Sequence, residues 1–255
     1  MRRVLEWLRF WRRPPPEITA ADWRSALRQI PYCLTLPPAD RERLRTLVAG
    51  FLATKTFEGA AGQPITDRLR CLIALQACLP ILNLGLDWYD DFAGIVVYPG
   101  DFRVRHRYLD EHGVEHEETE DRAGESWERG PVILSWQAVA AGRDAGQNVV
   151  LHEFAHKLDM QSGVADGCPP LHRGMDARAW QADFHAAYDD LCARVDRGED
   201  TLIDPYAGES PAEFFAVMSE VFFLEPRTLR AEYPRVYVQL RAFYRQDPAA
   251  VLGGG

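Results

Sequence analysis

Two histidines four residues apart, with a glutamate directly after the first, most limit how this chain can fold. The segment reads His152-Glu153-Phe154-Ala155-His156. On an α-helix, residues i and i+4 share one face, so both imidazoles can reach a single metal ion. Glu153 lies one step around the helix, where its carboxylate can meet a water on the metal instead of the metal itself. This HExxH pattern is typical of zinc hydrolases. The alternative is an amphipathic helix whose two histidines share a face by chance.

The net charge and the hydropathy limit the classes of function. The formal net charge is −9, which argues against a nucleic-acid-binding protein because phosphate contacts need a basic surface. The sequence contains no run of about 18 apolar residues, so no membrane span is expected. The chain of 255 residues is long enough for a real hydrophobic core.

The cysteines indicate a reducing compartment. They form an odd set of five without CxxC spacing, at Cys33, Cys71, Cys78, Cys168 and Cys192. Such a set fits neither a disulfide framework nor a zinc ribbon. We therefore expect reduced, mostly buried thiols in a cytoplasmic protein.

Residues 1–16 form a predicted basic tail. Its arginines are set among apolar side chains, at Arg2, Arg3, Arg9, Arg12 and Arg13. Charged residues interrupt the apolar stretch and no small-residue cleavage site follows, so a signal peptide is not expected. A basic amphipathic helix could touch a membrane surface or a partner. We favour a solvated tail that ends at Pro14-Pro15-Pro16.

The spacing of apolar residues predicts an α+β fold. We expect one domain of residues 17–255, with a helical part at 17–90 and a catalytic core at 91–245. A small mixed sheet should lie just before the HExxH helix, within a mainly helical remainder. Besides the HExxH helix, the predicted helices are 40–56, 64–79, 176–195, 211–224 and 234–245, and the predicted strands are 95–98, 132–136 and a hairpin of 103–109 with 114–118.

A catalytic zinc site needs a third protein ligand beside His152 and His156, and it keeps one position open for water. One class of HExxH enzymes takes a histidine six residues beyond the second one, but Ser162 stands there in this chain. The other large class takes a glutamate from a later helix. Glu213 opens such an apolar helix, and Glu220 follows two turns later on the same face.

Glu213 also has a competing structural role. Ser210-Pro211-Ala212-Glu213 is a capping box, in which the serine caps the helix and the glutamate reaches back to it. A buried first turn that faces a cation should favour the metal over the cap. Glu220 is then either the alternative ligand or an acceptor that orients a ligand histidine.

Three blocks in order resemble the Mlc titration factor A family. They are His152 to His156 with Leu158-Asp159, then Asp204-Pro205-Tyr206-Ala207, then Glu213-Phe214-Phe215-Ala216. That family consists of bacterial zinc metallopeptidases of the gluzincin type, similar in their catalytic core to anthrax lethal factor. The resemblance covers about residues 90–245, and it implies a zincin-like fold with one Zn²⁺ per chain.

The same resemblance implies the roles of individual residues. His152, His156 and Glu213 become the zinc ligands, Glu153 the general base, and Tyr206 the donor that steadies the transition state. It further implies aminopeptidase-like activity on a peptide or protein substrate, and binding of a transcriptional repressor such as Mlc. From the sequence alone, Tyr206 could equally pack its ring in a Pro-Tyr turn.

Several interpretations stay open at this level. The protein could be a regulatory binding protein with a structural zinc, but such a site closes with a fourth ligand, usually cysteine, and only Cys168 lies near. The strand 132–136 could pair with an extended peptide or be a plain core strand. Asp159 either orients a ligand histidine or lies on the helix surface.

Three further histidines raise the possibility of a second metal site. His106, His112 and His116 lie close together in the sequence, around the turn of the predicted hairpin. Neither helical nor strand geometry brings these side chains together cleanly across a turn. Solvated loop histidines are therefore the favoured interpretation.

Overall fold

The computed structural model describes residues 18–109, 115–126, 130–142 and 147–251, and the side chains of 103–109 and 115–122 are not described. The predicted tail at 1–16 and the turn with His112 therefore lie outside the described residues. The helices are α2 (Ala20–Leu27), α3 (Pro31–Thr35), α4 (Pro38–Thr54), α5 (Asp67–Cys78), α6 (Trp136–Ala141), α7 (Val149–Asp159), α8 (Ala177–Asp196), α9 (Pro211–Leu224), α10 (Pro226–Glu232), α11 (Pro234–Tyr244) and α12 (Pro248–Val251). The strands are β1 (Thr56–Gly59), β2 (Gly94–Tyr98), β3 (Phe102–Leu109), β4 (Glu115–Arg122), β5 (Gly124–Ser126) and β6 (Val132–Ser135).

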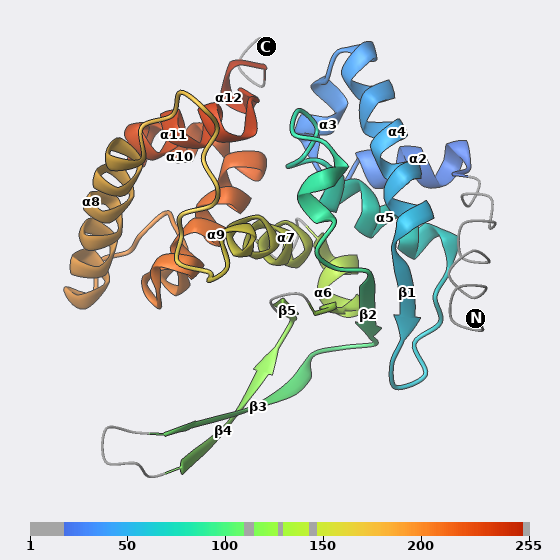
Figure 1. Ribbon diagram of the computed structural model, residues 1–255, viewed down its shortest axis with the longest axis horizontal. Coiled ribbons are helices and arrows are strands. Elements are labelled where there is room, and N and C mark those ends of the chain that lie inside the picture. The colour runs from blue at the N-terminus through green and yellow to red at the C-terminus, as the bar shows by residue number, and fades with distance from the viewer. Residues whose placement is uncertain (1–17, 110–114, 127–129, 143–146, 252–255) are drawn as a thin grey trace.

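The helices lie in two groups on either side of α7, which carries the HExxH pattern. Figure 1 shows α2 to α5 on one side and α8 to α12 on the other. The α+β class and the small mixed sheet predicted from the sequence are confirmed. None of the helices in the described part of the chain is both long enough and apolar enough to span a membrane.

The main sheet has four strands in the order β1-β2-β6-β5. β1 and β2 pair in parallel, as do β2 and β6, whereas β5 runs antiparallel to β6. β1 comes from the predicted helical part at 17–90 and β2 from the predicted core at 91–245, so one sheet draws on both parts. β3 and β4 form a separate antiparallel ribbon that projects away from the body of the molecule (Figure 1).

The sheet decides between the two interpretations of the strand at 132–136, an edge that pairs with a peptide or a plain core strand. β6 lies between β2 and β5, so the core strand is the correct one. Its backbone groups on both sides are therefore engaged within the sheet. Trp136 is not part of the strand, because the Ser135 hydroxyl accepts from the amide of Ala138 and starts α6. The strand beside α7 with an open edge is β5.

Helix α7 is anchored at its back by a cluster of aromatic rings. The ring of Phe154 lies 5.7 Å from Phe51, 5.1 Å from Tyr89 and 5.9 Å from Phe92, measured between centroids. Such tilted and edge-on ring pairs add to the stabilisation from burial. The packing fixes the rotation of α7, so its histidines face the opposite way, toward α9.

A buried cation reinforces this anchor. Lys157 on α7 is fully buried, with its Nζ 3.7 Å from Oδ2 of Asp91 and 3.3 Å from the carbonyl oxygen of Gly130. The same ammonium lies 4.7 Å from the centroid of the Phe92 ring. Burying this charge requires such partners, which tie α7 to the segments that precede β2 and β6.

Candidate metal centre and active site

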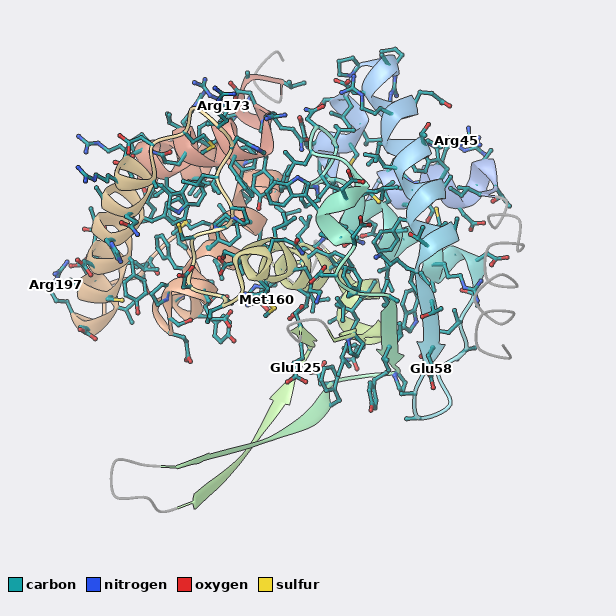
Figure 2. The ribbon with its side chains drawn as sticks, in the orientation of Figure 1. Arg45, Glu58, Glu125, Met160, Arg173 and Arg197 are labelled. Atoms are coloured by element: carbon teal, nitrogen blue, oxygen red, sulfur yellow. The ribbon has the colours of Figure 1, made fainter. Side chains whose placement is uncertain are left out.

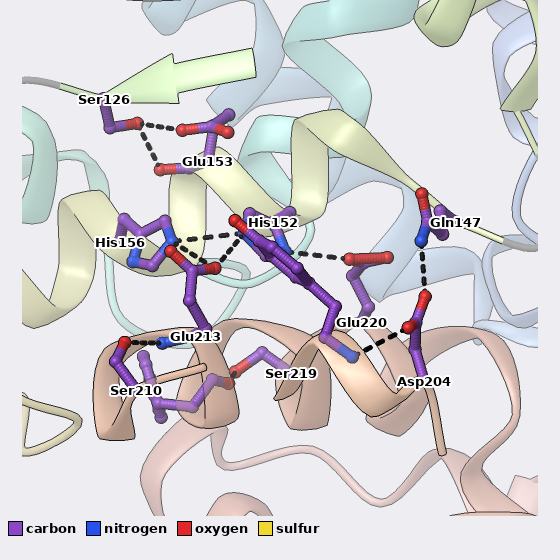
Figure 3. A network of polar contacts seen from close by, with 12 residues as sticks. Ser126, Gln147, His152, Glu153, His156, Asp204, Ser210, Glu213, Ser219 and Glu220 are labelled. Atoms are coloured by element: carbon purple, nitrogen blue, oxygen red, sulfur yellow. Dashed lines mark hydrogen bonds and ion pairs between the residues drawn. The ribbon is translucent and has the colours of Figure 1, made fainter. Parts of the chain in front are cut away.

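Two helices bring three side chains to one point. His152 and His156 lie on α7, which starts where the Asn148 side chain accepts from the amide of Leu151. Glu213 lies in the first turn of α9. Its Oε2 is 2.9 Å from Nε2 of His152 and 3.3 Å from Nε2 of His156, and the two Nε2 atoms are 3.2 Å apart (Figure 3).

These separations fit a metal ion. Bonds of about 2.0–2.2 Å at tetrahedral angles place the donor atoms about 3.3–3.6 Å from one another, and the separations here lie in this range or slightly below it. Among the described residues, His152, His156 and Glu213 are the group of histidine, cysteine and acidic side chains that could hold a metal. A donor set of two imidazoles and one carboxylate leaves a fourth position open.

The pKa shifts of His152 and Glu213 also favour a cation at this point. Burial lowers the pKa of His152, but its contacts with Glu213 and Glu220 outweigh burial and raise that pKa well above its ordinary value. Burial raises the pKa of Glu213, and its contacts with the two histidines outweigh burial and lower it. The site therefore favours positive charge between these groups, which a divalent cation supplies.

The carboxylate of Glu213 does not close the predicted capping box. The hydroxyl of Ser210 accepts a hydrogen bond from the Glu213 amide at 3.2 Å, so the serine half of the box is present. The side chain of Glu213 instead points to the two histidines (Figure 3). The serine cap and the histidine contacts therefore coexist, and the backbone of Glu213 serves one while its side chain serves the other.

Glu220 contacts the outer side of His152. Its Oε1 lies 3.1 Å from Nδ1 of His152, and its Oε2 accepts from the Asn148 amide at 2.8 Å. When Nδ1 carries a proton and donates it to Glu220, Nε2 keeps a free lone pair. That lone pair faces Glu213, where a metal would bind. Of the two roles open to Glu220, the geometry matches the one that orients a histidine.

Glu153 points to the sheet. The residue is 5% exposed, and the hydroxyl of Ser126 on β5 lies 2.8 Å from its Oε2 and 2.9 Å from its carbonyl oxygen. Burial raises the pKa of Glu153. A Cβ at Gly124 would lie 2.5 Å from Oε1 of Glu153, so only glycine lets β5 approach this closely.

Tyr206 lies on the opposite wall, in a 3-10 turn at Pro205–Gly208. The centroid of its ring is 6.0 Å from that of His152, and the residue is 40% exposed. Asp204 caps the turn through a 2.9 Å hydrogen bond from the amide of Tyr206. The ring is thus placed beside the histidines and open to a ligand.

These residues line one cleft of about 850 Å³. One wall is the face of α9 that carries Val217, Val221 and Leu224, and β5 lies in another. Figure 2 labels Glu125 and Met160, which both line the cleft where β5 approaches the end of α7. No lysine or arginine is among its described lining residues, whose acidic members are Asp101, Glu125, Glu153, Asp204, Glu209, Glu213, Glu220 and Glu225. The cleft thus combines an apolar wall with a negative lining.

Asp159 is buried, which excludes the surface alternative. Its Oδ2 accepts from the Gly167 amide at 2.8 Å, and burial raises its pKa to about 7. Within the described part of the chain, neither Oδ1 of Asp159 nor Nδ1 of His156 has a hydrogen-bond partner. The structure therefore shows no direct contact by which Asp159 orients His156.

The interpretation of His106, His112 and His116 as solvated loop histidines concerns side chains outside those that the structure describes. His112 lies outside the described residues, and the side chains of His106 and His116 are not described. In the backbone register of the ribbon, His106 pairs with Glu118, and His116 pairs with Tyr108. The two histidines are therefore not directly opposite one another.

Several residues of the site had no signal in the sequence that we recognised. Ser126 and Gly124 contact Glu153 from a strand of three residues that lacks an apolar alternation. Gln147 and Asn148 precede α7, and Asn148 could have been found as an N-cap before an apolar helix.

The cysteines agree with the prediction of reduced, mostly buried thiols. All five are free thiols, and Cys33, Cys71 and Cys78 are buried.

Comparisons with known proteins agree with this geometry. The sequence model of a family described as glucose-regulated metallo-peptidase M90 matches residues 6–245. Curated relatives called Mlc titration factor A, from Yersinia pestis (strain Pestoides F) and Yersinia pseudotuberculosis serotype O:3 (strain YPIII), are 37% identical over 253 residues. The matched region covers 98% of this chain and 93% of each relative.

Proposed function

Because the chain belongs to the glucose-regulated metallo-peptidase M90 family, that of Mlc titration factor A, we propose that it is a zinc peptidase. The observation that carries this proposal is the convergence of His152, His156 and Glu213 in the cleft that Glu153 also lines. Two imidazoles and one carboxylate with an open fourth position form the donor set of catalytic zinc sites. We propose one Zn²⁺ per chain in a single domain spanning residues 17–255.

Each side chain has a role in peptide hydrolysis. Bound zinc supplies a Lewis acid that activates water near neutral pH. Glu153 takes a proton from the attacking water and returns it to the leaving amine, and its raised pKa suits a group that must do both. Tyr206 donates a hydrogen bond to the carbonyl oxygen as negative charge develops on it.

The cleft suggests how a peptide lies in it. Among the described strands, β5 pairs with β6 alone, so its other edge can add an extended peptide as a further strand. An apolar side chain of the peptide would pack on Val217, Val221 and Leu224. The negative lining favours a cationic group, and the free amino end of a peptide is one, which supports an aminopeptidase-like activity.

A second function follows from the relatives. Their name, Mlc titration factor A, says that those proteins titrate Mlc. We propose that this chain also binds an Mlc-like transcriptional repressor, since the identity of 37% extends over 98% of the chain. The free thiols and the proposed partner both suit a cytoplasmic location.

Glu153→Gln tests the peptidase proposal. The change is nearly isosteric and removes only the base, so zinc content and folding should be retained while hydrolysis falls at least about a hundredfold. His152→Ala and His156→Ala should instead lose the zinc, as measured by metal analysis. Hydrolysis by Glu153→Gln at the parent rate, or no zinc uptake by the parent protein, would refute the proposal. Repressor binding retained by Glu153→Gln would show that the two functions are separable.

A further inference from the structure

The turn that carries Tyr206 is held at its start by one carboxylate with two contacts. Oδ1 of Asp204 accepts from the Tyr206 amide at 2.9 Å. Oδ2 of Asp204 accepts from Nε2 of Gln147 (Figure 3). The two residues are 57 positions apart in the sequence, so this bridge spans two separate segments.

Gln147 belongs to a segment that also reaches the metal side of the cleft. The next residue, Asn148, donates its amide to Oε2 of Glu220 at 2.8 Å, and Glu220 contacts His152. Asn148 in addition caps α7. Residues 147 and 148 therefore contact the Tyr206 turn on one side and the surroundings of His152 on the other.

The end of the same turn is fixed from α8. The hydroxyl of Tyr188 donates to the carbonyl oxygen of Gly208 at 3.0 Å. Ala207 in this turn is fully buried, whereas Tyr206 is 40% exposed. Packing of Ala207 and the contacts at the two ends of the turn together hold its backbone in place, and Asp204 is the end contact that reaches the Tyr206 amide.

We propose that Asp204 and Gln147 are positioning residues that hold Tyr206 at the distance from the metal centre at which it can act. This inference rests on the proposed function, because it assigns the pair to the transition-state contact of Tyr206. Placement errors of about 1 Å can cost a large part of the turnover. Loss of the bridge between Asp204 and Gln147 should therefore lower kcat through the position of Tyr206. Neither residue needs to touch the substrate.

The test compares Asp204→Ala and Gln147→Ala in the parent protein and in Tyr206→Phe. In the parent protein, each change should lower kcat roughly threefold to tenfold, the worth of one hydrogen bond, with KM and zinc content unchanged. In Tyr206→Phe, neither change should lower the residual kcat further, because the contact they serve is already gone. Asp204→Asn should restore most of kcat, since its amide can keep both contacts once the Gln147 amide turns over.

Asp176→Ala is the matched control. Asp176 caps α8 through the same contact with the residue two positions on, a 2.9 Å hydrogen bond from the Arg178 amide, and it is not among the residues that line the cleft. Its loss should leave kcat unchanged in both backgrounds. An equal loss of kcat from Asp204→Ala in the parent and in Tyr206→Phe would overturn the inference, and so would no loss in the parent.

Hydrogen exchange separates this inference from the proposed function. If the parent protein shows no metal-dependent hydrolysis, the proposed function fails at the first measurement. Exchange at the amides of Tyr206 and Ala207 still reports on the turn, and it should quicken in both Asp204→Ala and Gln147→Ala. Unchanged exchange in both variants would overturn the inference whatever the activity.

Discussion

Nδ1 of His152 lies 3.1 Å from Oε1 of Glu220, on the side of the ring opposite to the nitrogen that faces Glu213. The two glutamates of α9 therefore contact one imidazole from its two ends. This arrangement assigns them different effects on the metal. Glu213 faces the point where both histidines converge, whereas Glu220 can reach it only through His152.

Glu213→Gln and Glu220→Gln should accordingly weaken metal binding to different degrees. Replacing Glu213 by glutamine turns the one anionic donor of the three into a neutral amide, so most of the metal affinity should be lost. Replacing Glu220 leaves a single acceptor for His152 and Asn148, and affinity should fall about tenfold to a hundredfold. Competition with a chelator measures both. A larger loss in Glu220→Gln would mean that the roles are exchanged.

Tyr206→Phe should retain the metal and the fold but lower turnover. The phenyl ring preserves the packing near His152, and only the hydroxyl that we propose donates to the developing oxyanion is removed. Loss of such a donor costs on the order of a hundredfold in kcat. Steady-state kinetics on a peptide substrate provide the measurement, with metal analysis beside it. An unchanged kcat would make Tyr206 a packing residue.

Gly124→Ala should lower turnover through Glu153. The added Cβ would lie 2.5 Å from Oε1 of Glu153 and 2.6 Å from Cγ2 of Val149, so the carboxylate or β5 must shift. Gly94→Ala is the matched control in the same sheet, because its Cβ would meet only Pro131, at 3.4 Å or more. We expect kcat to fall in Gly124→Ala alone. Equal activity of the two variants would show that β5 does not constrain Glu153.

Asp159→Asn should change how stability depends on pH. The pKa of Asp159 is raised from 3.8 to about 7 in the folded protein. Between these values the folded protein holds a proton that the unfolded chain has released, so stability falls as pH rises from about 4 to about 7. The asparagine variant lacks this dependence, and its stability relative to the parent should rise by up to about 1.4 kcal/mol per pH unit.

Denaturant unfolding in the presence of a chelator, at pH 4.5 and pH 7.5, measures this difference. The chelator removes any contribution from a metal at the nearby His156. A stability difference that stays constant with pH would show that Asp159 has an ordinary pKa in the folded protein.

The parts of the site that could be predicted are those with local signals. The spacing of His152 and His156 implies a shared helix face, and Ser210-Pro211 marks the start of the helix that carries Glu213. Predicted and observed bounds agree for α9, and they differ by one residue at each end for α8, since Asp176 is a cap and not a helical residue. Capping residues and apolar periodicity are found within a few residues of the helix that they predict. Such a helix can therefore be predicted from the sequence alone.

The parts that could not be predicted depend on contacts between distant segments. Gly124-Glu125-Ser126 has no strand pattern of its own and is a strand because it pairs with β6. Without β5, the strand at 132–136 looked like a possible edge. Asp159 looked like either a surface or a ligand-orienting residue, because the loop with Gly167 that covers it is not visible in the pattern of α7.

The contact between His152 and Glu213 joins positions 61 residues apart. During synthesis, α7 leaves the ribosome long before α9, so a growing chain carries both histidines without their carboxylate. The three side chains can meet only after α9 has been made and has packed against α7. Capture of a metal by this donor set would then be a late step in the biogenesis of the protein.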